Sequence, residues 1–198
     1  MKIGIYGGSF NPPHKMHKKI VMDLIKHEDF DKIIIVPTGD KYRKEGLLAG
    51  IDRYNMLCQI FKKNDDVYIS SYEINEKMYT INTMNYYKKK FPKADLYFIC
   101  GLDNLAQITK WYKYEELLKN FKLFVVKRDT HQIDEEIKKF KKYKDRIVFS
   151  NIKPCNISST KIREEIVKRG YTKKLKDYLY VDTINYLKKI NAKDFWRK

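Results

Sequence analysis

IGIYGGSFNPPHKMH, residues 3–17, is the stretch of sequence that decides the fold of this chain. Its first residues, Ile3–Tyr6, are β-branched or aromatic apart from one glycine, and they predict a buried strand. Gly7-Gly8 lets the backbone approach a ligand closely, and Pro12-Pro13 prevents a helix from beginning earlier. His14 and His17 are spaced i, i+3, so a helix places both imidazoles on one face. A strand, a glycine turn and a helix N-terminus in this order predict an anion site.

Predicted strands and helices alternate along the rest of the chain. The strands are expected at 32–37, 67–71, 95–100, 121–126 and 146–150. The helices are expected at 15–26, 53–62 (capped by Asp52), 80–91, 115–119, 133–143, 158–169 and 180–190. This order predicts an α/β fold: a single Rossmann-like domain, 1–198, with an open parallel sheet, helices on both faces and a short helical C-terminal part. Gly7-Gly8, Thr38-Gly39 and Gly101-Leu102-Asp103 follow predicted strands, where such folds bind ligands.

The composition indicates which kinds of binding partner and which cellular compartment to expect. The net charge is +17, from 42 Lys and Arg against 25 Asp and Glu, so we expect anionic partners. No apolar run approaches the roughly 20 residues of a membrane span, and no signal peptide is recognised. Cys58, Cys100 and Cys155 fit neither a zinc site nor a disulfide framework, which favours a cytoplasmic protein. A basic nucleic-acid-binding protein remains an alternative, but the chain lacks its usual motifs, so no nucleic-acid partner is expected.

A second polar segment, Ile157-Ser158-Ser159-Thr160-Lys161-Ile162-Arg163, begins the predicted helix near the C-terminus. Ser158 or Ser159 can cap that helix, and hydroxyl groups, free N–H groups and Arg163 can meet a polyphosphate there. An ordinary capping box, with a surface arginine, is the alternative interpretation of this segment alone.

Both segments together resemble the signatures of the nucleotidyltransferase superfamily. GGSFNPPHKMH is similar to GxFxPxHxGH, with Met16 in place of the last glycine and Asn11 where an acidic residue is frequent, and ISSTKIR is similar to ISSTxIR. The resemblance implies that His14, His17 and Arg163 are catalytic. It also implies an ATP site made of Gly7, Gly8, Ser9, Phe10, Gly101, Asp103, Ser158, Ser159, Thr160 and Arg163.

The middle of the chain resembles one branch, the bacterial nicotinate mononucleotide adenylyltransferases. YTINTM (79–84), YFICGLDNL (97–105) and WYKYEELL (111–118) are similar to that family's SYTxxTL, fIxGxDsl and WYxyeeLL segments, and the likeness runs to about residue 170. It implies adenylyl transfer from ATP, with Mg²⁺, to nicotinate mononucleotide. The implied acceptor site contains Thr38, Thr80, Trp111 and Tyr112, although the two aromatic residues can also form a half-buried pair that packs the loop.

The segment 40–44, DKYRK, departs from the family's Pro-Pro-His-Lys at the border of the acceptor site. The same transfer to nicotinamide mononucleotide or phosphopantetheine, or a CTP-dependent reaction, therefore remains open. No cluster of carboxylates appears near the signatures, so Mg²⁺ is expected to enter with ATP and not to occupy a protein site. The sequence does not indicate an oligomeric state.

Overall fold

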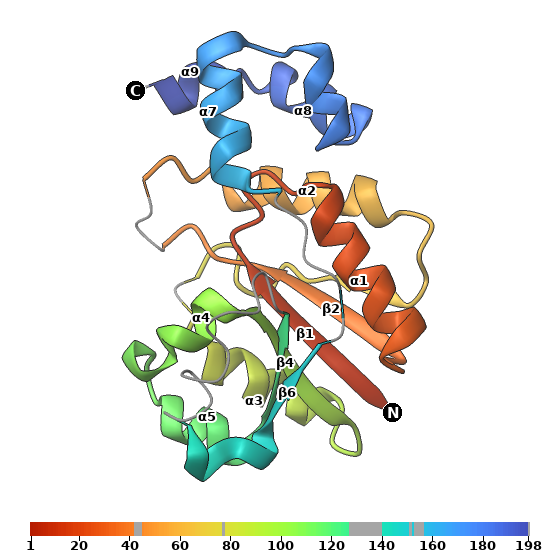
Figure 1. Cartoon of the computed structure of the whole chain (residues 1–198), viewed down its shortest axis with the longest axis vertical. Coiled ribbons are helices and arrows are strands. Elements are labelled where there is room, and N and C mark those ends of the chain that lie inside the picture. Colours follow the sequence, from red (N-terminus) through yellow and green to blue (C-terminus); the bar gives the residue numbers. More distant parts are fainter. Residues whose placement is uncertain (42–44, 77, 127–139, 151, 153–156, 198) are drawn as a thin grey trace.

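A computed structural model describes residues 1–41, 45–76, 78–126, 140–150, 152 and 157–197. Within them, six strands form one parallel sheet in the order β3-β2-β1-β4-β5-β6 (Figure 1). The strands are β1 (Lys2–Gly8), β2 (Lys32–Pro37), β3 (Val67–Ile69), β4 (Asp95–Gly101), β5 (Lys122–Val126) and β6 (Ile147–Phe149). The predicted parallel α/β sheet is confirmed.

Helices cover both faces of the sheet and form a C-terminal group (Figure 1). They are α1 (Lys15–His27), α2 (Gly50–Phe61), α3 (Thr80–Lys90), α4 (Leu102–Ala106), α5 (Tyr114–Asn120), α7 (Ser159–Arg169), α8 (Val181–Lys189) and α9 (Ala192–Arg197). Short 3-10 turns occupy Ile108–Lys110, Lys141–Arg146 and Lys173–Asp177. Helices α4 and α9 were not predicted, and most of the helix expected at 133–143 lies outside the described residues.

The prediction that Asp52 caps the second helix was wrong. Helix α2 begins at Gly50, whose N–H donates to Oδ1 of Asp40 at 2.5 Å. Asp52 instead lies inside the first turn, and its Oδ1 accepts a hydrogen bond from the Tyr186 hydroxyl. A carboxylate from the loop that precedes the helix accepts the N–H of Gly50 in place of the local cap, and sequence spacing does not reveal such a contact.

Successive residues along each central strand enter different cores, as the two-residue period of a strand requires. Ile34 and Val36 of β2 face the core under α3, α4 and α5, whereas Ile33 and Ile35 face the core under α1 and α2. A third apolar cluster joins Met56 of α2 to α7, α8 and α9, so α2 lies between the sheet and the C-terminal helices (Figure 1).

The chain changes direction across the sheet between β1 and β4. After β1 it builds β2 and β3 on one side, and it then crosses to β4 on the other side of β1. Ligands in open α/β sheets bind beyond the carboxyl ends of the strands at such a point. The turn after β1 and the residues after β4 therefore define the place for a site.

Candidate active site

The turn after β1 is held in an unusual backbone conformation. Phe10 has φ of 46°, a left-handed value that few residues other than glycine adopt. Its side chain is buried and makes edge contacts with the rings of Tyr6 and His17, at centroid distances of 5.3 and 4.9 Å. These ring contacts oppose the backbone strain and give the turn one defined shape.

The two histidines lie together at the start of α1, as predicted. Both are buried, and their rings stack with centroids 3.6 Å apart and planes 15° from parallel. The backbone N–H of His14 donates to Nδ1 of His17 at 3.0 Å. Because Nδ1 accepts a hydrogen bond, a neutral His17 ring carries its proton on Nε2. His17 is thereby prepared to donate a hydrogen bond from Nε2.

Helix α7 docks on this turn through the second signature. Ser159 Oγ donates to the carbonyl of Pro12 at 3.0 Å, and Arg163 Nη1 donates to the carbonyl of Asn11 at 2.9 Å. Arg163 Nη2 also lies 3.3 Å from Oγ1 of Thr160. Ser158 occupies the N-cap position of α7 but makes no side-chain cap hydrogen bond, and this N-terminus meets the chain just before α1 (Figure 1).

Two helix N-termini and an arginine therefore converge beyond β1. The dipoles of such helix ends attract phosphate, although at α1 the N–H of Lys15 already donates to the carbonyl of Tyr178 at 2.9 Å. Burial lowers the pKa of Arg163 from its ordinary value, but an arginine remains charged at neutral pH.

The residues after β4 lie beside this turn, because β4 pairs with β1. Gly101 ends β4, and the Asp103 carboxylate folds back over its α-carbon, where a side chain at 101 would collide with it. Asp103 is exposed in the first turn of α4. Gly101 and Asp103 are thus positioned at the switch point between β1 and β4.

Trp111 and Tyr112, the two aromatic residues of the expected acceptor site, differ in burial and in what they pack against. Trp111 is half-buried and packs edge-on against Phe98 of β4, with ring centroids 5.8 Å apart. Tyr112 is 51% exposed and lies 4.5 Å from the ring of Tyr79. Tyr79 is the N-cap residue of α3, so Tyr112 lies near Thr80, the first residue of that helix.

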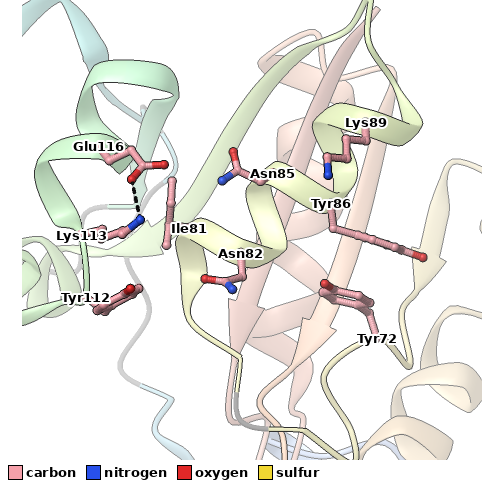
Figure 2. A pocket seen from close by; sticks show the side chains of 9 residues that line it. All are labelled: Tyr72, Ile81, Asn82, Asn85, Tyr86, Lys89, Tyr112, Lys113 and Glu116. Atoms are coloured by element: carbon pink, nitrogen blue, oxygen red, sulfur yellow. Dashed lines mark ion pairs between the residues drawn. The ribbon is translucent and has the colours of Figure 1, made fainter.

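A cavity of about 340 Å³ opens along the outer side of α3 (Figure 2). Its lining residues are Tyr72, Ile81, Asn82, Asn85, Tyr86, Lys89, Tyr112, Lys113 and Glu116. Lys113 and Glu116 form an ion pair at 3.3 Å on one wall, and the stacked rings of Tyr72 and Tyr86 form the other. Tyr112 is the one expected acceptor residue among them, and neither His14 nor His17 lines the cavity.

Sequence reasoning missed two ionisable residues near the strand ends, the buried Arg53 and the half-buried Glu73. Arg53 of α2 has an exposed fraction of 0% and donates to backbone carbonyls around the turn. Glu73 lies after β3, and burial raises its pKa to about 7, although a hydrogen bond from Thr83 opposes the shift. The sequence did contain an indication for Arg53, because residues 53, 56, 57 and 60 share one face of a helix and the last three are apolar.

Among the described residues, no group of three or more His, Cys, Asp or Glu side chains is arranged to hold a metal ion. The same part of the chain contains no helix that is both long enough and apolar enough to cross a membrane. The free thiols of Cys58 and Cys100 are described, whereas Cys155 lies outside the described residues.

Comparison with known proteins identifies the family of this chain. The family model described as cytidylyltransferase-like matches residues 5–165. A probable nicotinate-nucleotide adenylyltransferase of Aliarcobacter butzleri is 36% identical over 89% of this chain and 94% of its own length. A probable nicotinate-nucleotide adenylyltransferase of Fusobacterium nucleatum is 39% identical over 84% of this chain and 88% of its own length. The structure of Plasmodium falciparum nicotinic acid mononucleotide adenylyltransferase complexed with NaAD superposes with a TM-score of 0.84, at 25% identity and 98% coverage of both chains.

The parallel sheet with two helix N-termini at its switch point defines a class of α/β proteins that bind nucleotide phosphates. Within that class, the chain belongs to the cytidylyltransferase-like family and, inside it, to the nicotinate-nucleotide adenylyltransferases.

Proposed function

We propose that this chain transfers the adenylyl group of ATP to nicotinate mononucleotide, forming nicotinate adenine dinucleotide and pyrophosphate in NAD biosynthesis. The observation that carries the proposal is the docking of α7 on the β1 turn. Ser159 and Arg163 hold the carbonyls of Pro12 and Asn11, so the two signatures form one phosphate-binding surface. Relatives with this activity in their names match most of the chain.

The reaction requires positioning and charge stabilisation. A phosphate oxygen of the acceptor attacks the α-phosphorus of ATP, the bond from that phosphorus to the bridging oxygen breaks, and pyrophosphate leaves with the electron pair. In this proposal, Nε2–H of His17 donates to the transferring phosphate as negative charge accumulates, and His14 lies beside it. Ser159, Thr160 and Arg163 bind the departing pyrophosphate.

The remaining ATP contacts follow from the same arrangement. Gly7, Gly8, Ser9 and Phe10 bring the backbone to the triphosphate, Ser158 adds the N-terminus of α7, and Gly101 and Asp103 adjoin the nucleotide ribose. Mg²⁺ enters with ATP in this proposal, held by phosphate oxygens and water and neutralising their charge.

The acceptor binds on the side of Thr38, Thr80, Trp111 and Tyr112. Thr80 begins α3, whose N-terminal N–H groups attract a carboxylate. Tyr112 is exposed and offers an aromatic face for a pyridine ring, whereas Trp111, packed on Phe98, supports the loop. The Plasmodium falciparum relative, which matches the whole fold, was solved complexed with NaAD, the product that this proposal assigns to the chain.

Label transfer tests the proposed reaction. ATP labelled at the α-phosphate is incubated with Mg²⁺ and either nicotinate mononucleotide, nicotinamide mononucleotide or phosphopantetheine, and CTP is compared with ATP. We expect the label in nicotinate adenine dinucleotide, with one pyrophosphate released for each. Pyrophosphate release with phosphopantetheine alone or with CTP alone would contradict the proposal. So would the absence of transfer together with salt-dependent binding of oligonucleotides.

A further inference from the structure

Arg53 is a fully buried cation at a position where the sequence pattern of α2 requires an apolar side chain. It shares the core-facing side of the helix with Met56, Leu57 and Ile60, and its exposed fraction is 0%. A side chain so enclosed does not contact a bound substrate. A buried charge is unfavourable unless it is hydrogen-bonded. The hydrogen-bond partners of the guanidinium therefore account for a charged side chain at this buried position.

The guanidinium donates to chain segments from both sides of the proposed active site. Nη1 donates to the carbonyl of Ser9 at 3.0 Å, in the turn assigned to ATP. Nη2 donates to the carbonyl of Thr38 at 2.6 Å, in the segment after β2 assigned to the acceptor. The N–H of Thr38 also donates to the carbonyl of Gly8 at 2.9 Å, so the two strand ends are already adjacent. Arg53 thus fixes the distance between the two substrate sides.

The remaining nitrogen extends this network to α7. Nε of Arg53 donates to the carbonyl of Leu48 at 2.8 Å, and the N–H of Leu48 lies 3.2 Å from Oδ1 of Asn11. The carbonyl of Asn11 in turn accepts the hydrogen bond from Arg163. The turn after β1 is therefore held at two points, by Arg53 of α2 at the carbonyl of Ser9 and by Arg163 of α7 at the carbonyl of Asn11.

Asp40 supplies the negative charge that accompanies the buried cation. Its Oδ1 lies 3.1 Å from Nη2 of Arg53 and accepts the N–H of Gly50 at the start of α2. The side chain of Asp40 is 41% exposed, so the pair is buried on the arginine side alone. This pairing also orients the carboxylate toward α2.

We infer that Arg53 is a positioning residue for adenylyl transfer, which sets the alignment of the ATP turn against the acceptor strand without touching either substrate. The inference rests on the proposed function for the assignment of the two sides. Misalignment of reacting groups by about 1 Å can lower a rate about a hundredfold without a comparable loss of binding. Loss of Arg53 should therefore lower kcat more than it raises either KM.

Steady-state kinetics of Arg53→Met and Arg53→Lys test the inference. Methionine fills the buried volume without charge, and lysine keeps the charge but cannot reach all the carbonyls. Met56→Ala is the matched control, because Met56 is equally buried one turn later and packs toward the C-terminal helices. Each protein is assayed well below its own melting temperature, with nicotinate mononucleotide or whichever acceptor the wild type uses.

We expect Arg53→Met to lower kcat by about tenfold or more and Arg53→Lys to lower it less, with KM for ATP and for the acceptor changed by less than about threefold. Met56→Ala should lower the melting temperature and leave kcat near the wild-type value. Wild-type kcat in the Arg53 variants, or an equal loss in the control, would overturn the inference while the wild-type activity still supports the proposed function.

If neither Arg53 variant folds, Asp40→Asn tests the same network from its exposed end, and thermal melts accompany the kinetics because the buried guanidinium loses its negative partner. The amide still accepts the N–H of Gly50 but removes the charge beside the guanidinium. We expect kcat to fall about threefold with both KM values unchanged, because the guanidinium loses its oriented partner. An unchanged kcat would contradict the inference.

Discussion

Substitution of His17 separates its structural role from its proposed catalytic role. Its Nδ1 accepts the buried N–H of His14 at 3.0 Å, so His17→Ala leaves that donor unpaired and should cost about 1–3 kcal/mol of stability. The same change removes the Nε2–H donor from the transferring phosphate. Loss of one such donor lowers kcat about a hundredfold or more, while ATP binding changes little.

Two amide variants distinguish these effects. In both, an amide oxygen can accept the N–H of His14, as in a capping box, so both should recover most of the lost stability. The glutamine amide also reaches about as far as Nε2, whereas asparagine is one bond shorter. We therefore expect His17→Gln to retain more kcat than His17→Asn, which should resemble His17→Ala.

Thermal melts and steady-state rates with ATP and nicotinate mononucleotide measure both quantities on the same preparations. Near-normal kcat in His17→Ala would remove the histidine from the mechanism. Asparagine performing as well as glutamine would refute the assignment of the proton to Nε2.

Two further predictions concern Arg163 and Glu73. Arg163→Ala should raise KM for ATP about tenfold or more and change KM for the acceptor much less, and Arg163→Lys should restore it in part, because an ammonium does not fork onto phosphate. Burial raises the pKa of Glu73 from 4.5 to about 7. The folded protein therefore keeps a proton that the unfolded chain releases, so this group makes stability fall as pH rises through that interval. Relative to wild type, Glu73→Gln should gain about 2 kcal/mol of unfolding free energy between pH 5 and pH 8 in urea titrations.

Each of these predictions has a defined failure. Equal losses for ATP and the acceptor would make Arg163 a structural residue that secures the Asn11 carbonyl. A stability difference between Glu73→Gln and wild type that stays constant with pH would mean that Glu73 is not the group that titrates there.

The sequence was sufficient where a structural signal is local. The strand, glycine turn and helix start of residues 3–17 were predicted in order, and the structure has β1 and α1 there. The apolar segments predicted the parallel sheet, because strands buried on both faces have few polar positions. The likeness of both signatures to known motifs indicated which helix N-termini should meet, and α7 does contact the β1 turn.

The features that escaped prediction depend on contacts between distant parts of the chain. Asp40 caps α2 from ten positions before Gly50, so the local candidate Asp52 was a misleading signal. Arg53 finds its acceptors in three separate segments, and no local pattern encodes them. Trp111 and Tyr112 are neighbours in sequence, and tertiary packing alone decided which of them is half-buried.

The preference between two acceptors tests the central claim most directly. Nicotinate and nicotinamide mononucleotides have nearly the same shape, but a site that aims N–H donors at a carboxylate leaves the amide NH₂ facing a donor. A mispaired buried group costs about 1–3 kcal/mol. At fixed ATP, kcat/KM for nicotinate mononucleotide should exceed that for nicotinamide mononucleotide by at least about tenfold. Equal values, or a preference for the amide, would contradict the account.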